Sequence, residues 1–191
     1  GEWRIEETWP PQDAIAHEIV LSSCQSTGTW VGTGALVVGG DSSPVVECSP
    51  IDMENDSHIA GLATIHLSVV PNFDGGQVFV EMQDSETGLR LGHATMDVRY
   101  HAGGYVAQTV TPGEVLVMLM EFQAIDAILP AGHGITYVMT ETGEDYLQPA
   151  CTPACFMHVL PSLSTAELPL IDRDSSDALI TPQGETAANN Q

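Results

Sequence analysis

The feature that most constrains the fold is an alternation of apolar and polar residues with a period of two. In residues 64–69, Ile65, Leu67 and Val69 would share one face of a strand, with polar residues on the other. Successive side chains of a strand point to opposite faces, so this pattern predicts a half-buried strand. The alternation recurs in residues 78–82, 94–100, 135–139 and 166–170. Residues 115–120 are continuously apolar, which predicts a central strand covered on both faces.

Turn signals separate these runs. Glycine supplies a positive φ and proline presets φ, so clusters of the two reverse the chain direction. Such clusters occupy residues 71–76, 86–88, 102–104, 111–113 and 130–132. Strands separated by turns of this kind are typical of a β-sandwich or a β-barrel. Only residues 13–21 fit a short helix, and they fit a strand equally well.

The chain of 191 residues has the length of one large domain. We expect residues 1–171 to form a single β-sandwich, and the polar residues 172–191 to be a disordered tail or a partner contact. Within the sandwich, residues 24–57 are rich in Gly, Ser, Thr and Pro and predict an irregular covering segment with one strand at residues 35–38. The start lacks a leader pattern and is already strand-like, as expected of a fragment of a longer protein.

Charge excludes two classes of partner. The chain has 26 acidic residues, four arginines and no lysine, for a formal net charge of −22. A field of this sign repels phosphate backbones and anionic lipids, which argues against nucleic-acid and membrane-surface roles. No run of apolar residues is long enough to span a membrane. The acidic residues are scattered, which favours solubility or adaptation to salt over attraction of a cationic ligand.

The four cysteines are too few for a disulfide framework in a chain of this length. Cys24 and Cys48 bracket a Gly/Ser-rich stretch, whereas Cys151 and Cys155 are separated by three residues. A structural zinc site prefers two close pairs of ligands, and only one close pair exists. Local disulfides and small buried thiols both remain open.

The motifs of the common catalytic classes are absent. The chain has no G-x-S-x-G nucleophile elbow, no H-E-x-x-H pair and no phosphate-binding glycine loop. We therefore predict no catalytic residue and no cofactor. The carboxylates of Asp52, Glu54 and Asp56 are weak calcium candidates, because alternate carboxylates supply hard oxygen ligands. The segment fails as an EF-hand, since the turning glycine and closing glutamate are missing, and a solvated acidic loop is the favoured alternative.

The histidines are dispersed along the chain. His66 and His101 lie on the polar faces of predicted strands, and His93 shares its side with Thr95. His133 lies in a turn at the start of a strand, where we expect a structural hydrogen-bonding residue rather than a catalyst.

Three tryptophans lie toward the N-terminus, at positions 3, 9 and 30. Exposed indole rings serve as platforms for sugars, but tryptophans are more often large buried anchors at interfaces. We therefore favour packing for all three.

Several motifs together resemble a known family. They lie in residues 1–11, 61–70, 76–84, 91–96, 111–113 and 129–133, in that order and with that spacing. This arrangement is similar to the C-terminal domain of X-Pro dipeptidyl-peptidases, which cocaine esterase and α-amino-acid ester hydrolases share. The resemblance extends over about residues 1–171, and its specific parts are residues 1–9 and 59–140.

The resemblance implies an all-β jelly-roll sandwich, similar to galactose-binding-like domains and packed against an α/β-hydrolase domain. In that family the Ser-Asp-His triad belongs to the hydrolase domain, so the resemblance assigns no catalytic residue to this chain. It implies an accessory domain of a serine peptidase or esterase, with a structural and site-orienting role. Residues 134–137 and 146–151 depart from the family pattern, which leaves the partner surface and the substrate class open.

Two other functions remain open. A carbohydrate-binding module would use Trp30, Tyr105 and Tyr146 in its loops. An interaction domain, including a homo-oligomer, would use Val37, Val38 and the N-terminal tryptophans as an exposed apolar patch. For the accessory domain, we expect the N-terminal segment to be the seam with the hydrolase domain.

Overall fold

A 15-residue strand, β5 (Ser57–Pro71), organises the first of two antiparallel sheets, which we call sheet A. The computed structural model describes residues 7–26, 36–39, 45–141 and 156–171. One edge of β5 pairs with β8 (Leu116–Leu129). Its other edge pairs with β11 (Thr165–Ile171) and then β10 (Phe156–Val159), which follow one another along it. Strands β1 (Ala14–Val20) and β3 (Leu36–Gly39) extend the sheet beyond β11 and β10.

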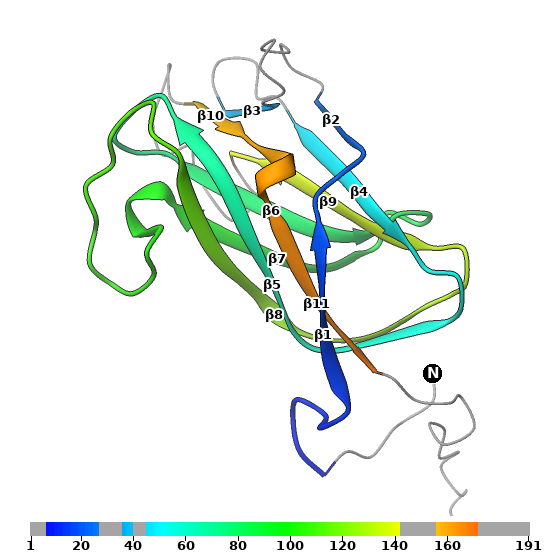
Figure 1. Ribbon diagram of the computed structural model, residues 1–191. Coiled ribbons are helices and arrows are strands. Elements are labelled where there is room, and N and C mark those ends of the chain that lie inside the picture. Colours follow the sequence, from blue (N-terminus) through cyan, green and yellow to red (C-terminus); the bar gives the residue numbers. More distant parts are fainter. Residues whose placement is uncertain (1–6, 27–35, 40–44, 142–155, 172–191) are drawn as a thin grey trace, which may run out of the picture.

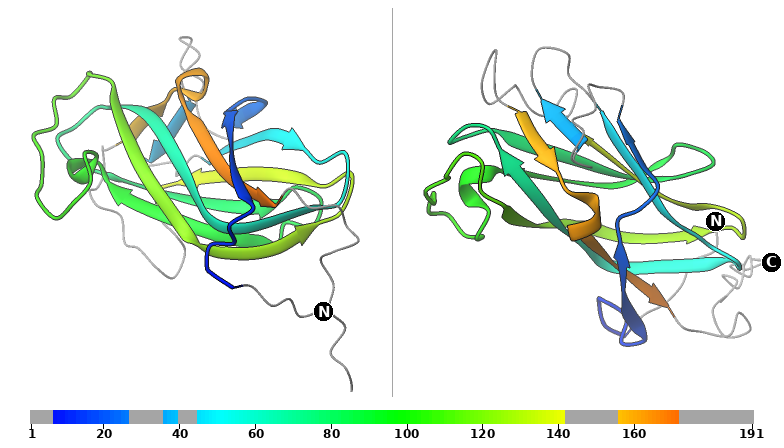
Figure 2. Two further views of the ribbon diagram at one scale, coloured as in Figure 1. Left: turned by 60° about the horizontal axis from the view of Figure 1, so that its bottom comes forward. Right: turned by 45° about the horizontal axis from the view of Figure 1, so that its top comes forward.

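The second sheet, sheet B, has the strand order β2-β4-β9-β6-β7. Its strands are β2 (Cys24–Ser26), β4 (Val46–Asp52), β9 (Gly134–Thr140), β6 (Gln77–Asp84) and β7 (Arg90–Asp97). The two sheets stack face to face, and the chain passes repeatedly from one to the other (Figures 1 and 2). This order is that of a jelly roll, so the predicted all-β jelly-roll sandwich is confirmed. In the described part of the chain, no helix has the length and apolar character that crossing a membrane requires.

The core lies between the sheets and consists of the faces that the alternation predicts. From sheet A, Ile65, Leu67 and Val69 of β5 are fully buried, and from sheet B so are Val80 and Met82 of β6. Burying one such side chain contributes about 1.5–3 kcal/mol to folding. The residues between them on each strand point outward. The hydrophobic effect therefore fixes which face of each strand is inside.

One strand prediction is wrong. Residues 115–120 are predicted as a central strand covered on both faces. In the structure β8 begins at Leu116 and pairs only with β5 among the described residues, so it is an edge strand of sheet A. Met118 and Met120 are buried, whereas Val117 and Leu119 are each 51% exposed. A continuous apolar run gives no signal that one of its faces lacks a cover.

The segment 24–57, expected to be irregular, contains β2, β3 and β4. Strand β4 was missed because Pro50 interrupts its pattern; the register with β9 shifts between Cys48 and Ile51. The structure also settles two other segments. Residues 13–21 contain strand β1, and β7 ends at Asp97, whose side chain caps a 3-10 turn, η1 (Val98–Tyr100), in place of the predicted continuation of the strand.

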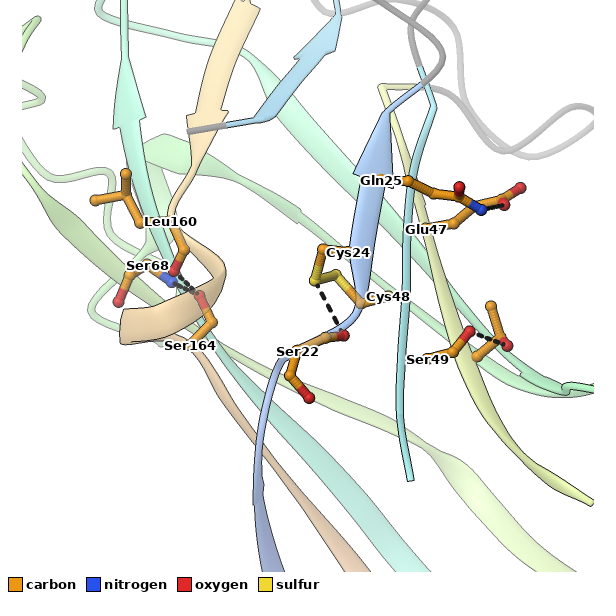
Figure 3. The surroundings of a disulfide bond; sticks show 10 residues. Ser22, Cys24, Gln25, Glu47, Cys48, Ser49, Ser68, Leu160 and Ser164 are labelled. Atoms are coloured by element: carbon orange, nitrogen blue, oxygen red, sulfur yellow. Dashed lines mark hydrogen bonds between the residues drawn. A yellow bond between two sulfur atoms is a disulfide. The ribbon is translucent and has the colours of Figure 1, made fainter. Parts of the chain in front are cut away.

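A disulfide joins the first two strands of sheet B. Cys24 and Cys48 lie directly opposite one another in the β2–β4 pair, and their Cα atoms are 4.0 Å apart (Figure 3). The disulfide links the short edge strand β2 to the longer strand β4. Cys24 and Cys48 therefore form a local disulfide and are not separate buried thiols. Cys151 and Cys155 lie outside the described residues.

Two buried serines hold the junction where β10 gives way to β11. Between these strands the chain forms a 3-10 turn, η2 (Pro161–Leu163), so β5 loses its pairing partner there. Ser164, with no exposed surface, replaces that partner: its Oγ accepts the Ser68 N–H at 2.9 Å and donates to the Leu160 carbonyl at 2.8 Å (Figure 3). The Ser68 hydroxyl donates to the Leu163 carbonyl at 2.6 Å. The two hydroxyls thus satisfy backbone groups that the turn would otherwise leave unpaired.

We predict that Ser164→Ala lowers the free energy of unfolding by about 1–3 kcal/mol, because it leaves the buried Ser68 N–H without an acceptor. Ser162→Ala, at an exposed position of the same turn, is the matched control and should change it by less than about 0.5 kcal/mol. Urea unfolding followed by circular dichroism measures both. Equal midpoints for the two variants would contradict the role assigned to Ser164.

Candidate functional site

The most highly organised polar cluster joins an aspartate and a histidine from two turns at one end of the sandwich. Asp84 is the last residue of β6, and His133 lies in the turn between β8 and β9. The Nδ1 atom of His133 is 2.9 and 3.0 Å from the two carboxylate oxygens of Asp84. The Asp84 side chain is only 7% exposed and that of His133 is 24% exposed. The pair is therefore a largely buried charge-assisted contact between residues 49 positions apart.

Backbone donors complete the surroundings of Asp84. Its Oδ1 accepts the N–H of Glu86 at 2.9 Å and that of Thr87 at 3.3 Å, which shapes the turn into β7. Burial by itself would raise the pKa of Asp84, but the hydrogen bonds from His133, Glu86 and Thr87 together lower it to about 2. The carboxylate is thus held ionised.

A third turn meets the other two. The carbonyl of His133 accepts the Met53 N–H at 2.7 Å, and the Met53 carbonyl accepts the Gly132 N–H at 2.8 Å. The Gly134 N–H donates to Ser85 Oγ at 2.8 Å. Gly134 is required here, because a Cβ at this position would overlap the backbone carbonyl of Ile51. The cluster therefore ties residues 52–56, 84–89 and 130–134 together at one end of the sandwich, opposite the long loop between β7 and β8 (Figure 1).

Asp84 and His133 have the arrangement of two members of a Ser-His-Asp triad. In a triad, Nε2 of the histidine takes a proton from a nucleophilic hydroxyl or thiol. Among the described residues, no serine, threonine or cysteine side chain forms a hydrogen bond with Nε2 of His133. Asp84 and His133 therefore order three turns, in line with the structural role expected of His133. The sequence-based prediction did not single out Asp84, although an aspartate before Ser-Glu-Thr-Gly is a signal for a turn cap.

The calcium candidates do not form a cluster. Oδ1 of Asp56 accepts the Ala131 N–H at 2.8 Å and so supports the turn between β8 and β9. Asp52 ends β4 opposite Gly134, and Glu54 is exposed. Residues 7–26, 36–39, 45–141 and 156–171 contain no group of three or more His, Cys, Asp and Glu that could hold a metal ion.

The other histidines are separate from this cluster. His66 lies on the outer face of β5, and His93 of β7 stacks on Phe79 with ring centroids 5.3 Å apart. His101 follows η1, where its Nδ1 is 2.9 Å from the Val98 carbonyl.

The aromatic residues named for other roles are described only in part. Trp9 is 47% exposed, and Tyr105, in the loop between β7 and β8, is fully exposed. Trp3, Trp30 and Tyr146 lie outside the described residues. Val37 and Val38 belong to β3, of which only the backbone is described. The predicted sugar platform and the predicted apolar patch therefore stay predictions, since most of their side chains lie outside the described part of the chain.

Comparison with known proteins identifies the family. The sequence profile described as the X-Pro dipeptidyl-peptidase C-terminal non-catalytic domain matches residues 1–140. The chain belongs to this family. A C-terminal non-catalytic domain is consistent with an Asp84–His133 pair that lacks a nucleophile among the described residues. The resemblance predicted from the sequence motifs is therefore confirmed.

Relatives of this C-terminal domain are much longer than the chain. A curated Xaa-Pro dipeptidyl-peptidase of Streptomyces avermitilis is 25% identical over 100 residues, which are 52% of this chain and 14% of that protein. An aminopeptidase from a marine sediment archaeon of the Thaumarchaeota matches 87% of this chain and 38% of its own, with 12% identity and a TM-score of 0.65. A CocE/NonD family hydrolase from Staphylococcus aureus gives the same coverage, with 10% identity and a TM-score of 0.65. At these identities the two structures show a shared fold.

We predict that Asp84→Asn lowers the free energy of unfolding by about 1.5–3 kcal/mol at neutral pH, because it weakens hydrogen bonds to a buried charge. Glu86→Gln, at an exposed position of the same turn, is the control and should have little effect. Because folding lowers the pKa of Asp84, its contribution is complete above the ordinary value of 3.8 and is lost as the pH falls to about 2. Urea unfolding across this range should therefore show a steeper decline for the native chain than for Asp84→Asn, and parallel declines would contradict this account.

The calcium hypothesis has a direct test. Because Asp56 already accepts a backbone hydrogen bond, we predict that Tm in excess calcium and in excess EDTA agrees within about 1 °C. A bound ion at 100 times its Kd would add about 2.7 kcal/mol and raise Tm by several degrees. Such a rise, abolished in Asp52→Asn or Glu54→Gln, would establish a calcium site and overturn the prediction.

Proposed function

We propose that this chain is the accessory C-terminal domain of a larger serine hydrolase that resembles X-Pro dipeptidyl-peptidases and cleaves peptides or esters. Catalysis would take place in an α/β-hydrolase domain outside these 191 residues. The observation that carries this proposal is the match of residues 1–140 to a domain family described as C-terminal and non-catalytic. The lengths of the relatives support it, since the chain corresponds to 14% of one and 38% of two others.

The contribution of the domain would be positional. A jelly roll of two sheets, in each of which the strands are hydrogen-bonded to one another, is a rigid body. The Asp84–His133 contact adds rigidity to three of its turns. A rigid body packed beside a catalytic domain limits the positions that the walls of the active site adopt. Well-oriented reacting groups lower the barrier of a reaction, so a change in that packing changes the rate.

The charge of the chain supports a protein partner. With its formal net charge of −22, the chain repels nucleic acids and anionic membrane surfaces, whereas it attracts a domain with basic side chains at its interface. We therefore propose the hydrolase domain as the partner.

The test compares three proteins encoded by the same gene: the full-length product, the product truncated before Gly1, and the 191-residue chain alone. The substrates are Ala-Pro-p-nitroanilide and p-nitrophenyl butyrate. We predict that the full-length product cleaves at least one of them, that the truncated product has a value of kcat/KM lower by about tenfold or more, and that the chain alone has no activity above buffer. Enzyme-like turnover by the chain alone, or an unchanged kcat/KM after truncation, would contradict the proposal.

A further inference from the structure

The outer face of sheet A carries a row of residues that continues across four strands. The pairing register places Val20 of β1 beside Thr165 of β11, Thr165 beside His66 of β5, and His66 beside Leu119 of β8. The residues on either side of them along each strand belong to the core, so these four side chains point away from it. We call these four residues the apolar row, because the two residues at its ends, Val20 and Leu119, are aliphatic.

Both ends of the apolar row expose large aliphatic side chains. Val20 is 53% exposed and Leu119 is 51% exposed. Next to the row, Val117, which pairs with Ser68, is 51% exposed, and Leu163 of η2 is 62% exposed. Single exposed aliphatic residues are ordinary on a protein surface, but a group of them on one sheet face indicates an interaction site.

An acidic row runs parallel to the apolar row on the same face. Here the register aligns Glu18 of β1, Glu167 of β11, Thr64 of β5 and Glu121 of β8. Glu18 and Glu167 are direct cross-strand neighbours, an arrangement that is unfavourable for two like charges. None of the three carboxylates forms an ion pair with another described residue; the described arginines pair with Glu81 and Asp97. A partner with basic side chains would relieve this repulsion.

Some polar side chains on the outer face of sheet A pair with one another, since Thr64 Oγ1 donates to Glu167 Oε2 at 3.4 Å and His58 Nε2 lies 2.5 Å from Asp126 Oδ1. Among the described residues, the outer face of sheet B has more such pairs. Ser49 and Thr136 share a hydrogen bond of 2.8 Å, and Glu81 accepts hydrogen bonds from Arg90 at 2.7 Å and from Gln83 at 2.6 Å. This face is internally satisfied, as expected of a sheet that faces water. The exposed aliphatic residues Val20, Val117 and Leu119, together with the cross-strand neighbours Glu18 and Glu167, therefore favour the outer face of sheet A as the one suited to a partner.

The N-terminal segment reaches the domain on this same side. The β1–β11 register is unbroken, so Pro169 points to the side of Glu167 and Thr165. A Cβ placed on Gly61 would lie 3.0 Å from Cβ of Pro169 and 3.5 Å from Cβ of Pro10, so Pro10 lies beside Pro169. Residues 7–13 thus approach next to the lower ends of β1 and β11 (Figure 1). A domain joined before residue 7 would start from this side.

We propose that the outer face of sheet A, with its apolar and acidic rows, docks against the α/β-hydrolase domain of the same polypeptide, which presents an apolar strip bordered by arginine or lysine side chains. This inference rests on the proposed function and specifies its partner surface. It also changes the expected position of the seam with the hydrolase domain, which was the N-terminal segment. The N-terminal segment marks the margin of the interface, and Leu119 and Val20 lie within it.

The test introduces a charge into the apolar row of the full-length gene product. Leu119→Arg places a bulky cation on the docking face, and Leu89→Arg is the matched control, because Leu89 is 63% exposed in the turn between β6 and β7. Thermal unfolding and kcat/KM toward the two chromogenic substrates are measured for each variant. We expect Leu119→Arg to separate the unfolding of the sandwich from that of the hydrolase domain and to lower kcat/KM by about tenfold, with Leu89→Arg unchanged. In the isolated 191-residue chain, Leu119→Arg should leave Tm unchanged, because the position faces solvent.

The possible outcomes separate this inference from the function on which it rests. If the full-length protein unfolds cooperatively and Leu119→Arg behaves as Leu89→Arg does, the domains dock through another surface and the inference is wrong, while the proposed function stands. If truncation before Gly1 leaves kcat/KM unchanged, the proposed function itself fails. If the isolated chain is a dimer by light scattering and Leu119→Arg makes it monomeric, the occupant is a second copy of the chain, and the inference is again overturned.

Discussion

The architecture depends on the backbone pairing of β5. This strand forms twelve register pairs with β8 on one edge and continues into β10 and β11 on the other, so it connects most of sheet A. Because its inward side chains also make up the centre of the core, pairing and burial reinforce each other in the same residues. At the junction of β10 and β11 this ladder loses its strand partner, and there Ser68 and Ser164 replace the missing backbone bonds.

The sequence predicts what depends on local pattern. Alternation identified β5, β6, β9 and β11, because each has one buried face and one solvated face. It failed for β8, where Val117 and Leu119 make the outer face as apolar as the inner face. Such a run is the same whether a second layer of the domain or another protein covers it. The failure therefore contains information, since it marks the strand whose outer side chains lack a cover in the described part of the chain.

The polar cluster could not be predicted in the same way. Asp84 and His133 are 49 residues apart, and they meet only because β6 and β9 are neighbours in sheet B and both reach the same end of the sandwich. Its components were visible separately, as a turn after Asp84 and a histidine at the Gly-His corner. The lack of a nucleophile motif also predicted correctly that this chain belongs to a non-catalytic domain family. The Asp84–His133 pair shows how the geometry of part of a triad is used to order turns.

The central claim is that the outer face of sheet A is an internal interface of a larger hydrolase. A crystal structure of the full-length gene product tests it directly, through the exposed fraction of Leu119, which is 51% in the isolated domain. The account predicts that Leu119 and Val20 are buried against the hydrolase domain, with basic side chains beside Glu18, Glu167 and Glu121. A structure in which Leu119 stays exposed to solvent while the hydrolase domain contacts the outer face of sheet B would contradict the account.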